Sequence, residues 1–144
     1  MRERLVRLYW LMVAPAILLF AVLYAVDKLG LADPGPWTSA HPGIGTGVFI
    51  TAALLGVAAP LGLRTAFVSS HRDQGSIPEG EVERFQRRVL LVALCSPYLA
   101  VVAAYLELPT VLFAGTVLSA FYALYYLYPT RRRIAHERRI FRTD

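Results

Sequence analysis

Four long stretches without an internal charged residue constrain this chain more than any other feature. They cover approximately Leu8–Val26, Ile44–Leu63, Val89–Leu106 and Pro109–Tyr128. At 1.5 Å per residue, each can cross the roughly 30 Å hydrocarbon core of a bilayer as a helix. Because backbone polar groups in lipid must be satisfied within the protein, we predict an all-α integral membrane protein, a bundle of four transmembrane helices.

Composition supports a lipid solvent over water. The chain has 144 residues, 56% of them hydrophobic, and a mean hydropathy of +0.49. A water-soluble protein of this size could not bury so much apolar surface. We therefore predict one transmembrane domain over residues 1–144, with a basic tail at 129–144. The first stretch is longer than a signal-peptide core of about 7–15 residues, so we expect it to be retained.

The basic residues predict the orientation, since Lys and Arg are held on the cytoplasmic side during insertion. Fourteen of the 15 precede the first stretch, lie between the second and third, or follow the fourth. The remaining one, Lys28, lies on the other side beside Asp27 and Asp33. We expect a bacterial-type inner membrane protein with both termini and the middle loop in the cytoplasm.

The connections differ in character. Residues 27–43 carry three prolines and several glycines, which predicts an ordered, non-helical loop on the membrane surface. Glu107–Pro109 is so short that the third and fourth spans must form a tight antiparallel hairpin.

The middle loop contains the start of a helix. Ser76 and Glu79 are spaced as a capping box, with Pro78 tolerated early in the helix. Glu81–Arg84 and Glu83–Arg87 are spaced to meet on one helical face. We predict a helix that runs unbroken into the third span and projects about three turns into the cytoplasm. It is either a solvated extension or a docking surface.

The tail resumes helical character over Thr130–Arg142, where Ile134 and Phe141 are seven residues apart among arginines. Such a basic amphipathic segment can lie in the interface with its apolar side down, each arginine contributing about 1 kcal/mol on anionic lipid. We therefore expect anionic headgroups as partners, together with other membrane subunits or a second copy, and no nucleic acid. The predicted contact residues are Arg64, Arg84, Arg87, Arg88, Tyr125, Tyr128, Arg131, Arg132, Arg133, Arg138 and Arg139.

Several function classes lack their residues. A proton-coupled antiporter needs a carboxylate within a span, and none is there. The three histidines lie outside the spans, which argues against a membrane haem site. The single Cys95 excludes a thiol pair, an intramolecular disulfide and a cysteine-based zinc site. We predict no catalytic, cofactor-binding or metal-binding residue.

Small and hydroxyl residues within the spans predict helix packing. Pro15, Pro60 and Pro97 are each expected to kink a span, with Ser96 compensating locally. A weak internal repeat also relates Arg7 and Pro15 to Arg88 and Pro97.

These observations favour a non-catalytic accessory subunit of a larger membrane complex that presents an Arg-rich cytoplasmic face. The proline kinks and the repeat suggest an alternative, an oligomeric channel or carrier. A third hypothesis is a membrane enzyme that uses Arg and Tyr on a lipid or conjugate.

Overall fold

The computed structural model describes residues 2–31, 41–72, 77–128, 130, 132, 135 and 136. These residues form helices and turns, and no strand occurs among them. The elements are α1 (Arg2–Lys28), α3 (Pro42–Ala53), the π-helical turn η1 (Leu54–Ala58), α4 (Ala59–Ser70), α5 (Glu79–Ala93), α6 (Ser96–Tyr105) and α7 (Thr110–Tyr126).

Three helical stretches are long and apolar enough to cross a membrane: Glu3–Lys28, Gly43–Ser70 and Glu79–Tyr105. The predicted all-α fold is therefore confirmed for the described residues, with three helices that have the length and apolar character of membrane spans. The fourth predicted span corresponds to α7, an apolar helix of 17 residues. At 1.5 Å per residue it is about 26 Å long, slightly less than a typical hydrocarbon core.

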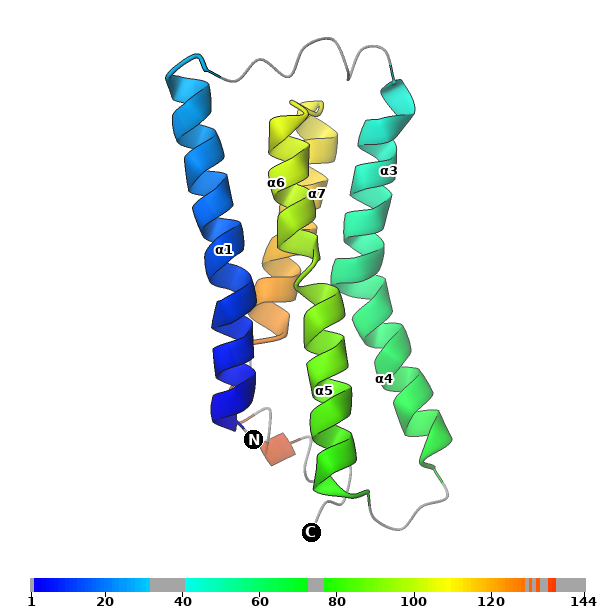
Figure 1. Ribbon diagram of the computed structural model, residues 1–144. Coiled ribbons are helices and arrows are strands. Elements are labelled where there is room, and N and C mark those ends of the chain that lie inside the picture. The colour runs from blue at the N-terminus through cyan, green and yellow to red at the C-terminus, as the bar shows by residue number, and fades with distance from the viewer. Residues whose placement is uncertain are drawn as a thin grey trace.

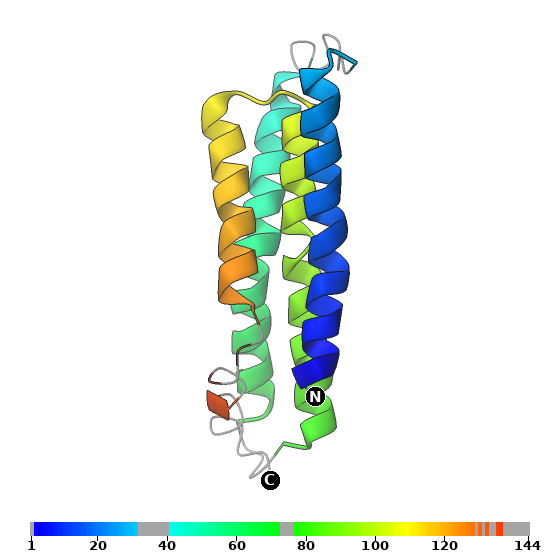
Figure 2. The ribbon, with the colours of Figure 1, turned by 90° about the vertical axis from the view of Figure 1, so that its left-hand side faces the viewer.

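The helices run side by side in one elongated bundle. In Figure 1, α5 and α6 lie between α1 and the α3–α4 helix, and α7 lies behind them. α7 packs on α6 and α3, while α1 packs mainly on α6. Figure 2 shows α4 and α5 continuing well past the end of α7. One end of the bundle therefore holds the start of α1, the end of α4, the start of α5 and the end of α7.

The second span bends through a widened turn. In η1 the Ala59 N–H bonds to the Leu54 carbonyl five residues back, and Pro60 follows at once. Proline has no N–H and its ring crowds the carbonyl four residues earlier, so a wider turn before it relieves the clash. Pro15, in contrast, lies inside an uninterrupted α1.

The predicted cytoplasmic helix does run unbroken into the third span, as α5, and at Pro97, where a kink was predicted, the span is interrupted. α5 ends at Ala93, Leu94 and Cys95 form a turn, and α6 begins at Ser96. Pro97 explains the break, because it cannot donate to the carbonyl of residue 93 and it disfavours helical geometry just before it. Ser96 does not compensate within its own helix, since its Oγ donates to Ala52 O of α3 at 3.2 Å.

The helix ends also differ from prediction. α1 continues to Lys28 and α3 begins at Pro42, so both ends of the predicted outer loop are helical, and residues 32–40 lie outside the described part. α5 has Pro78 as its N-cap, without a side-chain cap bond. The predicted cap residue, Ser76, lies outside the described residues. The tight hairpin is confirmed, with α6 ending at Tyr105 and α7 starting at Thr110.

Small residues fill the centre of the bundle. Ala52, Ser96, Ala103, Thr116 and Ala123 are all fully buried. Lipid provides no hydrophobic drive between helices, so close backbone approach and hydrogen bonds must hold them. A larger apolar cluster between α1, α5 and α7 contains Tyr9, Val13, Val89, Leu90, Ala93, Leu94, Ala123 and Leu127.

Two tyrosines tie α1 to its neighbours. The hydroxyl of Tyr9 donates to Leu124 O at 3.0 Å, one of the last carbonyls of α7, which has no partner in its own helix. The hydroxyl of Tyr98 donates to Met12 O at 2.7 Å, in the turn before Pro15. The first hydroxyl thus satisfies a carbonyl at a helix end, and the second links α6 to α1.

Candidate functional site

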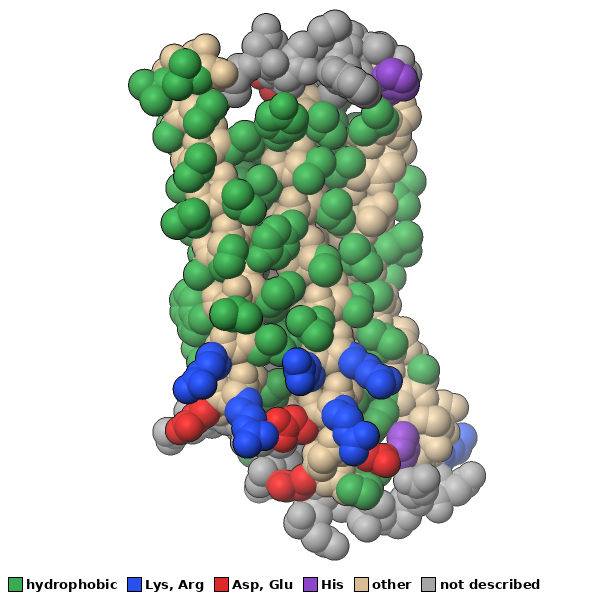
Figure 3. All heavy atoms as spheres, viewed as in Figure 1, with side chains coloured by type: hydrophobic (Ala, Val, Ile, Leu, Met, Phe, Trp, Pro, Cys, Tyr) green, Lys and Arg blue, Asp and Glu red, His purple; other side chains and the backbone are tan. Residues whose placement is uncertain are grey.

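A belt of basic side chains lies near one end of the bundle. In Figure 3, hydrophobic side chains cover the visible face, and Lys and Arg gather in a band near the lower end, with acids among and below them. The exposed arginines of this part of the chain come from three places: Arg4 and Arg7 lie in the first turns of α1, Arg72 follows α4, and Arg84, Arg87 and Arg88 lie in α5. The basic residues that are asymmetrically distributed in the sequence thus form a band on the surface of the folded protein.

Within the belt, α5 concentrates three arginines. Arg84 and Arg88 are one turn apart, and Arg87 lies beside them. Neither predicted pair, Glu81–Arg84 or Glu83–Arg87, forms an ion pair among the described residues. Arg84 Nε instead donates to the carbonyl of Gly80, one turn earlier in the same helix, at 3.2 Å. Like charges at this spacing repel by a few tenths of a kcal/mol. The three guanidinium groups therefore favour an anionic neighbour.

Arg84 and Arg88 line a groove of about 490 Å³ between α4 and α5. Its aromatic floor is formed by Phe67 of α4 and Phe85 of α5, whose rings stack with centroids 4.2 Å apart. Its upper wall is apolar and includes Leu63. The groove thus joins a positive rim to an apolar surface that continues into the spans.

A histidine–carboxylate contact lines the groove between α4 and α5. His71 Nε2 lies 3.2 Å from Glu81 Oε2, and His71 Nδ1 lies 2.9 Å from Phe67 O. Ser70 Oγ also lies 3.0 Å from Nδ1, so the ring can donate from Nε2 to Glu81 while Nδ1 accepts from the Ser70 hydroxyl. Glu81 is thereby paired with His71, not with Arg84 as the sequence spacing predicted. This leaves the groove with a net positive rim.

The groove therefore combines guanidinium donors with an apolar floor, which is the chemistry that suits an anionic amphiphile. No protein-family model, curated protein or solved structure matches the chain. The assignment of function accordingly depends on the geometry and charge of the described residues.

The structure separates the two predicted contact tyrosines. Tyr125 is 89% exposed on the outside of α7. Tyr128 turns inward and packs edge-on against Tyr9, with ring centroids 5.1 Å apart. The two therefore do not share one site.

The predicted arginines are also distributed. Arg84 and Arg88 come together at the groove, with Arg87 next to them, while half-buried Arg64 on α4 is not among the lining residues. Arg132 is exposed after α7. Arg131, Arg133, Arg138 and Arg139 lie outside the described residues.

Two features were missed from the sequence. The groove depends on Phe67 and His71, because α4 extends about two turns beyond the predicted end of the second span. The signal was the absence of glycine and proline over residues 63–71, with aromatic residues four apart at 67 and 71.

The other missed feature is an open helix face. Gly43 and Gly47 lie one turn apart on the exposed side of α3, and a Cβ placed on either would meet nothing within 4 Å. Thr51 continues the row and bonds to Gly47 O at 2.8 Å. The spacing Gly-x-x-x-Gly in an apolar helix was the available signal.

Proposed function

We propose that this chain is a non-catalytic membrane subunit that spans the bilayer four times, with its basic end in the cytoplasm. Its arginine belt binds anionic lipid headgroups, and its lipid-depth surface lies against partner membrane proteins. The observation that carries the proposal is the set of three exposed α5 arginines, none of which pairs with a described carboxylate.

Their position supports a role at the membrane surface. The arginines begin where the apolar surface ends (Figure 3), which is the level of the lipid phosphates when α1 and the α3–α4 helix cross the bilayer. Each contributes about 1 kcal/mol near an anionic leaflet. The groove below Leu63 adds an apolar surface that a lipid acyl chain can cover.

The arrangement of the helix ends is consistent with four spans. One end of the bundle holds the start of α1, the end of α4, the start of α5 and the end of α7, and the opposite end holds the end of α1, the start of α3, the end of α6 and the start of α7 (Figures 1 and 2). With 17 residues, α7 is at the lower limit for a spanning helix, which slight local thinning of the bilayer accommodates.

Hydroxyl groups at membrane depth support a structural role. Those of Tyr9, Ser96 and Tyr98 donate to backbone carbonyls of other helices. Those of Thr116 and Ser119 donate to carbonyls one turn back in their own helix. These groups act in helix packing, and the open Gly43–Gly47 face of α3 permits the close approach of a further helix.

The subunit role is tested by purification from the native host in mild detergent. We expect the tagged chain to elute with at least one membrane protein in a fixed ratio, and to do so when a large excess of untagged host membrane is mixed in after solubilisation. Elution only as a free monomer contradicts the subunit role.

The lipid role is tested separately in nanodiscs by native mass spectrometry. The variant Arg84→Gln/Arg87→Gln/Arg88→Gln should bind phosphatidylglycerol more weakly, by about fivefold per arginine at about 1 kcal/mol each. Lys28→Gln, at the other end, is the matched control and should bind like the wild type. Equal binding by all three proteins contradicts the lipid role.

A channel or carrier remains the second candidate, because the helix irregularities of two spans meet. The widened turn η1 and the break before Ser96 contact each other through Gly56 and the Ser96–Ala52 hydrogen bond. Interrupted helices at one depth are typical of transport proteins. Protein-dependent flux of small cations into liposomes would support this candidate, and its absence would remove it.

A further inference from the structure

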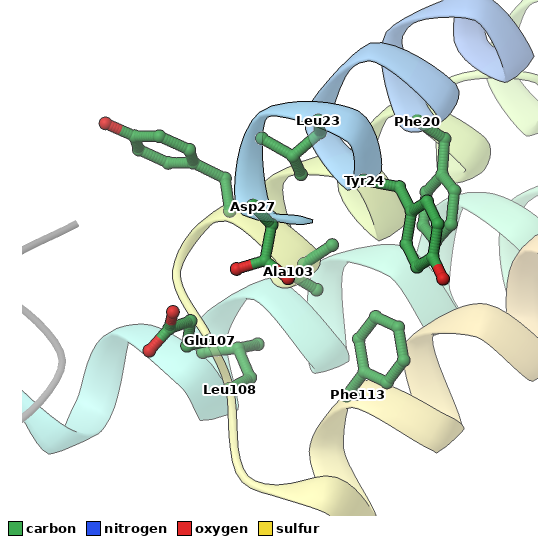
Figure 4. A pocket seen from close by; sticks show the side chains of 10 residues that line it. Phe20, Leu23, Tyr24, Asp27, Ala103, Glu107, Leu108 and Phe113 are labelled. Carbon is green, nitrogen blue, oxygen red and sulfur yellow. The ribbon is translucent and has the colours of Figure 1, made fainter. Parts of the chain in front are cut away.

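The end of the bundle opposite the arginine belt contains a pocket of about 300 Å³ between α1, α6 and α7. Figure 4 shows its two ends. The carboxylates of Asp27 and Glu107 lie at one end, and the rings of Phe20, Tyr24 and Phe113 lie at the other. The pocket is therefore amphipathic, with acids from two separate elements and aromatic side chains from two helices.

Charge and shape limit what this pocket can bind. Two carboxylates repel an anion and attract a cation, whereas a neutral apolar molecule gains nothing from their charge. Lys28 does not line the pocket, but its Nζ lies 5.6 Å from the centroid of the ring of Tyr24, which does. Asp27, Glu107 and Lys28 together carry a net charge of −1, which matches one cationic group.

The aromatic rings lie at the other end from the carboxylates, where they suit the apolar part of such a ligand. The Tyr24 ring is already in contact with Lys28, whose Nζ lies 5.6 Å from its centroid. The apolar walls formed by Phe20, Leu23 and Phe113 can cover a hydrocarbon or aromatic body.

We propose that this pocket binds an amphiphilic organic monocation. Its ammonium group lies between Asp27 and Glu107, and its apolar body lies among Phe20, Tyr24 and Phe113. The pocket is at the ends of the helices, where membrane meets water, so such a ligand can enter with its charge in water and its body in lipid. The proposal is independent of the function inferred for the arginine belt.

The backbone at Glu107 makes a clean test possible. Glu107 follows α6 with a φ of +49°, and its N–H and that of Leu108 bond back to Ala104 O and Ala103 O, both at 3.2 Å. This is the Schellman ending of a helix, in which glycine is the favoured residue at the left-handed position. Glu107→Gly therefore removes the carboxylate without penalising the turn.

The probe is benzyltrimethylammonium, titrated by isothermal calorimetry into the full chain in micelles of the uncharged detergent dodecyl maltoside, with empty micelles as the blank. We expect saturable binding by the wild type and at least tenfold weaker binding by Asp27→Asn/Glu107→Gln. Glu107→Gly should also bind at least threefold more weakly while melting at or above the wild-type temperature. Glu3→Gln, at the opposite end, is the matched control and should bind like the wild type.

The neutral isostere neopentylbenzene separates charge recognition from partition into the micelle. It should show no saturable binding under the same conditions. The proposal is overturned if the wild type does not saturate with the cation, if the double variant binds it equally well, or if the neutral isostere binds as tightly.

Discussion

Gly56→Ala should destabilise the bundle by about 2 kcal/mol. Gly56 is buried in the widened turn η1, where three helices meet. A Cβ at this position would lie 2.9 Å from Ser119 O of α7 and 2.9 Å from Ser96 Oγ of α6. Both distances are several tenths of an ångström shorter than ordinary van der Waals contact, so one helix must move.

The size of the effect depends on whether the two contacting atoms can move away from the new Cβ. The Ser119 oxygen belongs to the α7 backbone and has no rotamer to change, so the cost is that of overpacking, about 1–3 kcal/mol. Displacing Ser96 also weakens its bond to Ala52 O, and such bonds between membrane helices average about 0.6 kcal/mol. The better helix propensity of alanine offsets at most about 1 kcal/mol of this destabilisation.

The assay is reversible unfolding in mixed micelles with increasing dodecyl sulfate, followed by far-UV circular dichroism. Gly62→Ala is the matched control in the same long helix, since a Cβ there would meet nothing within 4 Å. We expect Gly62→Ala to be as stable as the wild type or slightly more so. If Gly56→Ala and Gly62→Ala unfold at the same dodecyl sulfate content, the expected clash at the three-helix junction is refuted.

Three further outcomes follow from the same structure. Tyr9→Phe should lose about 1 kcal/mol in the unfolding assay, because the Leu124 carbonyl at the end of α7 loses its donor, whereas Tyr125→Phe, 89% exposed, should be neutral. Glu81→Gln should change stability by less than about 0.5 kcal/mol, since its contact with His71 is partly exposed to solvent; a larger loss would show that this contact holds α4 and α5 together. The exposed thiol of Cys95, at the break in the third span, should resist a charged maleimide in intact vesicles and react after dodecyl sulfate is added; rapid labelling in the vesicles would place it in water.

The main architecture was predictable because hydrocarbon imposes a simple requirement. A run of about 20 apolar residues must be helical, so the apolar stretches located the helices correctly. Proline positions also indicated where two spans depart from regular geometry. They did not reveal how, because the choice between a widened turn at η1 and a full break before Ser96 depends on what each helix contacts.

The sites were less predictable. Sequence spacing placed Glu81 next to Arg84, but a histidine from another helix, His71, is the observed partner. Spacing along one helix cannot indicate which helix lies opposite. The same limit applies to the pocket of Asp27 and Glu107, residues 80 positions apart that meet only because α1 and α6 end at the same level.

The central claim is that the chain crosses the membrane four times with its basic end on one side. It is tested most directly by labelling single cysteines in sealed right-side-out vesicles with a charged maleimide. Three exposed glutamates provide matched sites in a Cys95→Ala background: Glu3→Cys, Glu79→Cys and Glu107→Cys. We predict labelling of Glu107→Cys from outside, and labelling of the other two only after the vesicles are opened. Labelling of Glu3→Cys and Glu79→Cys from opposite sides would contradict the account.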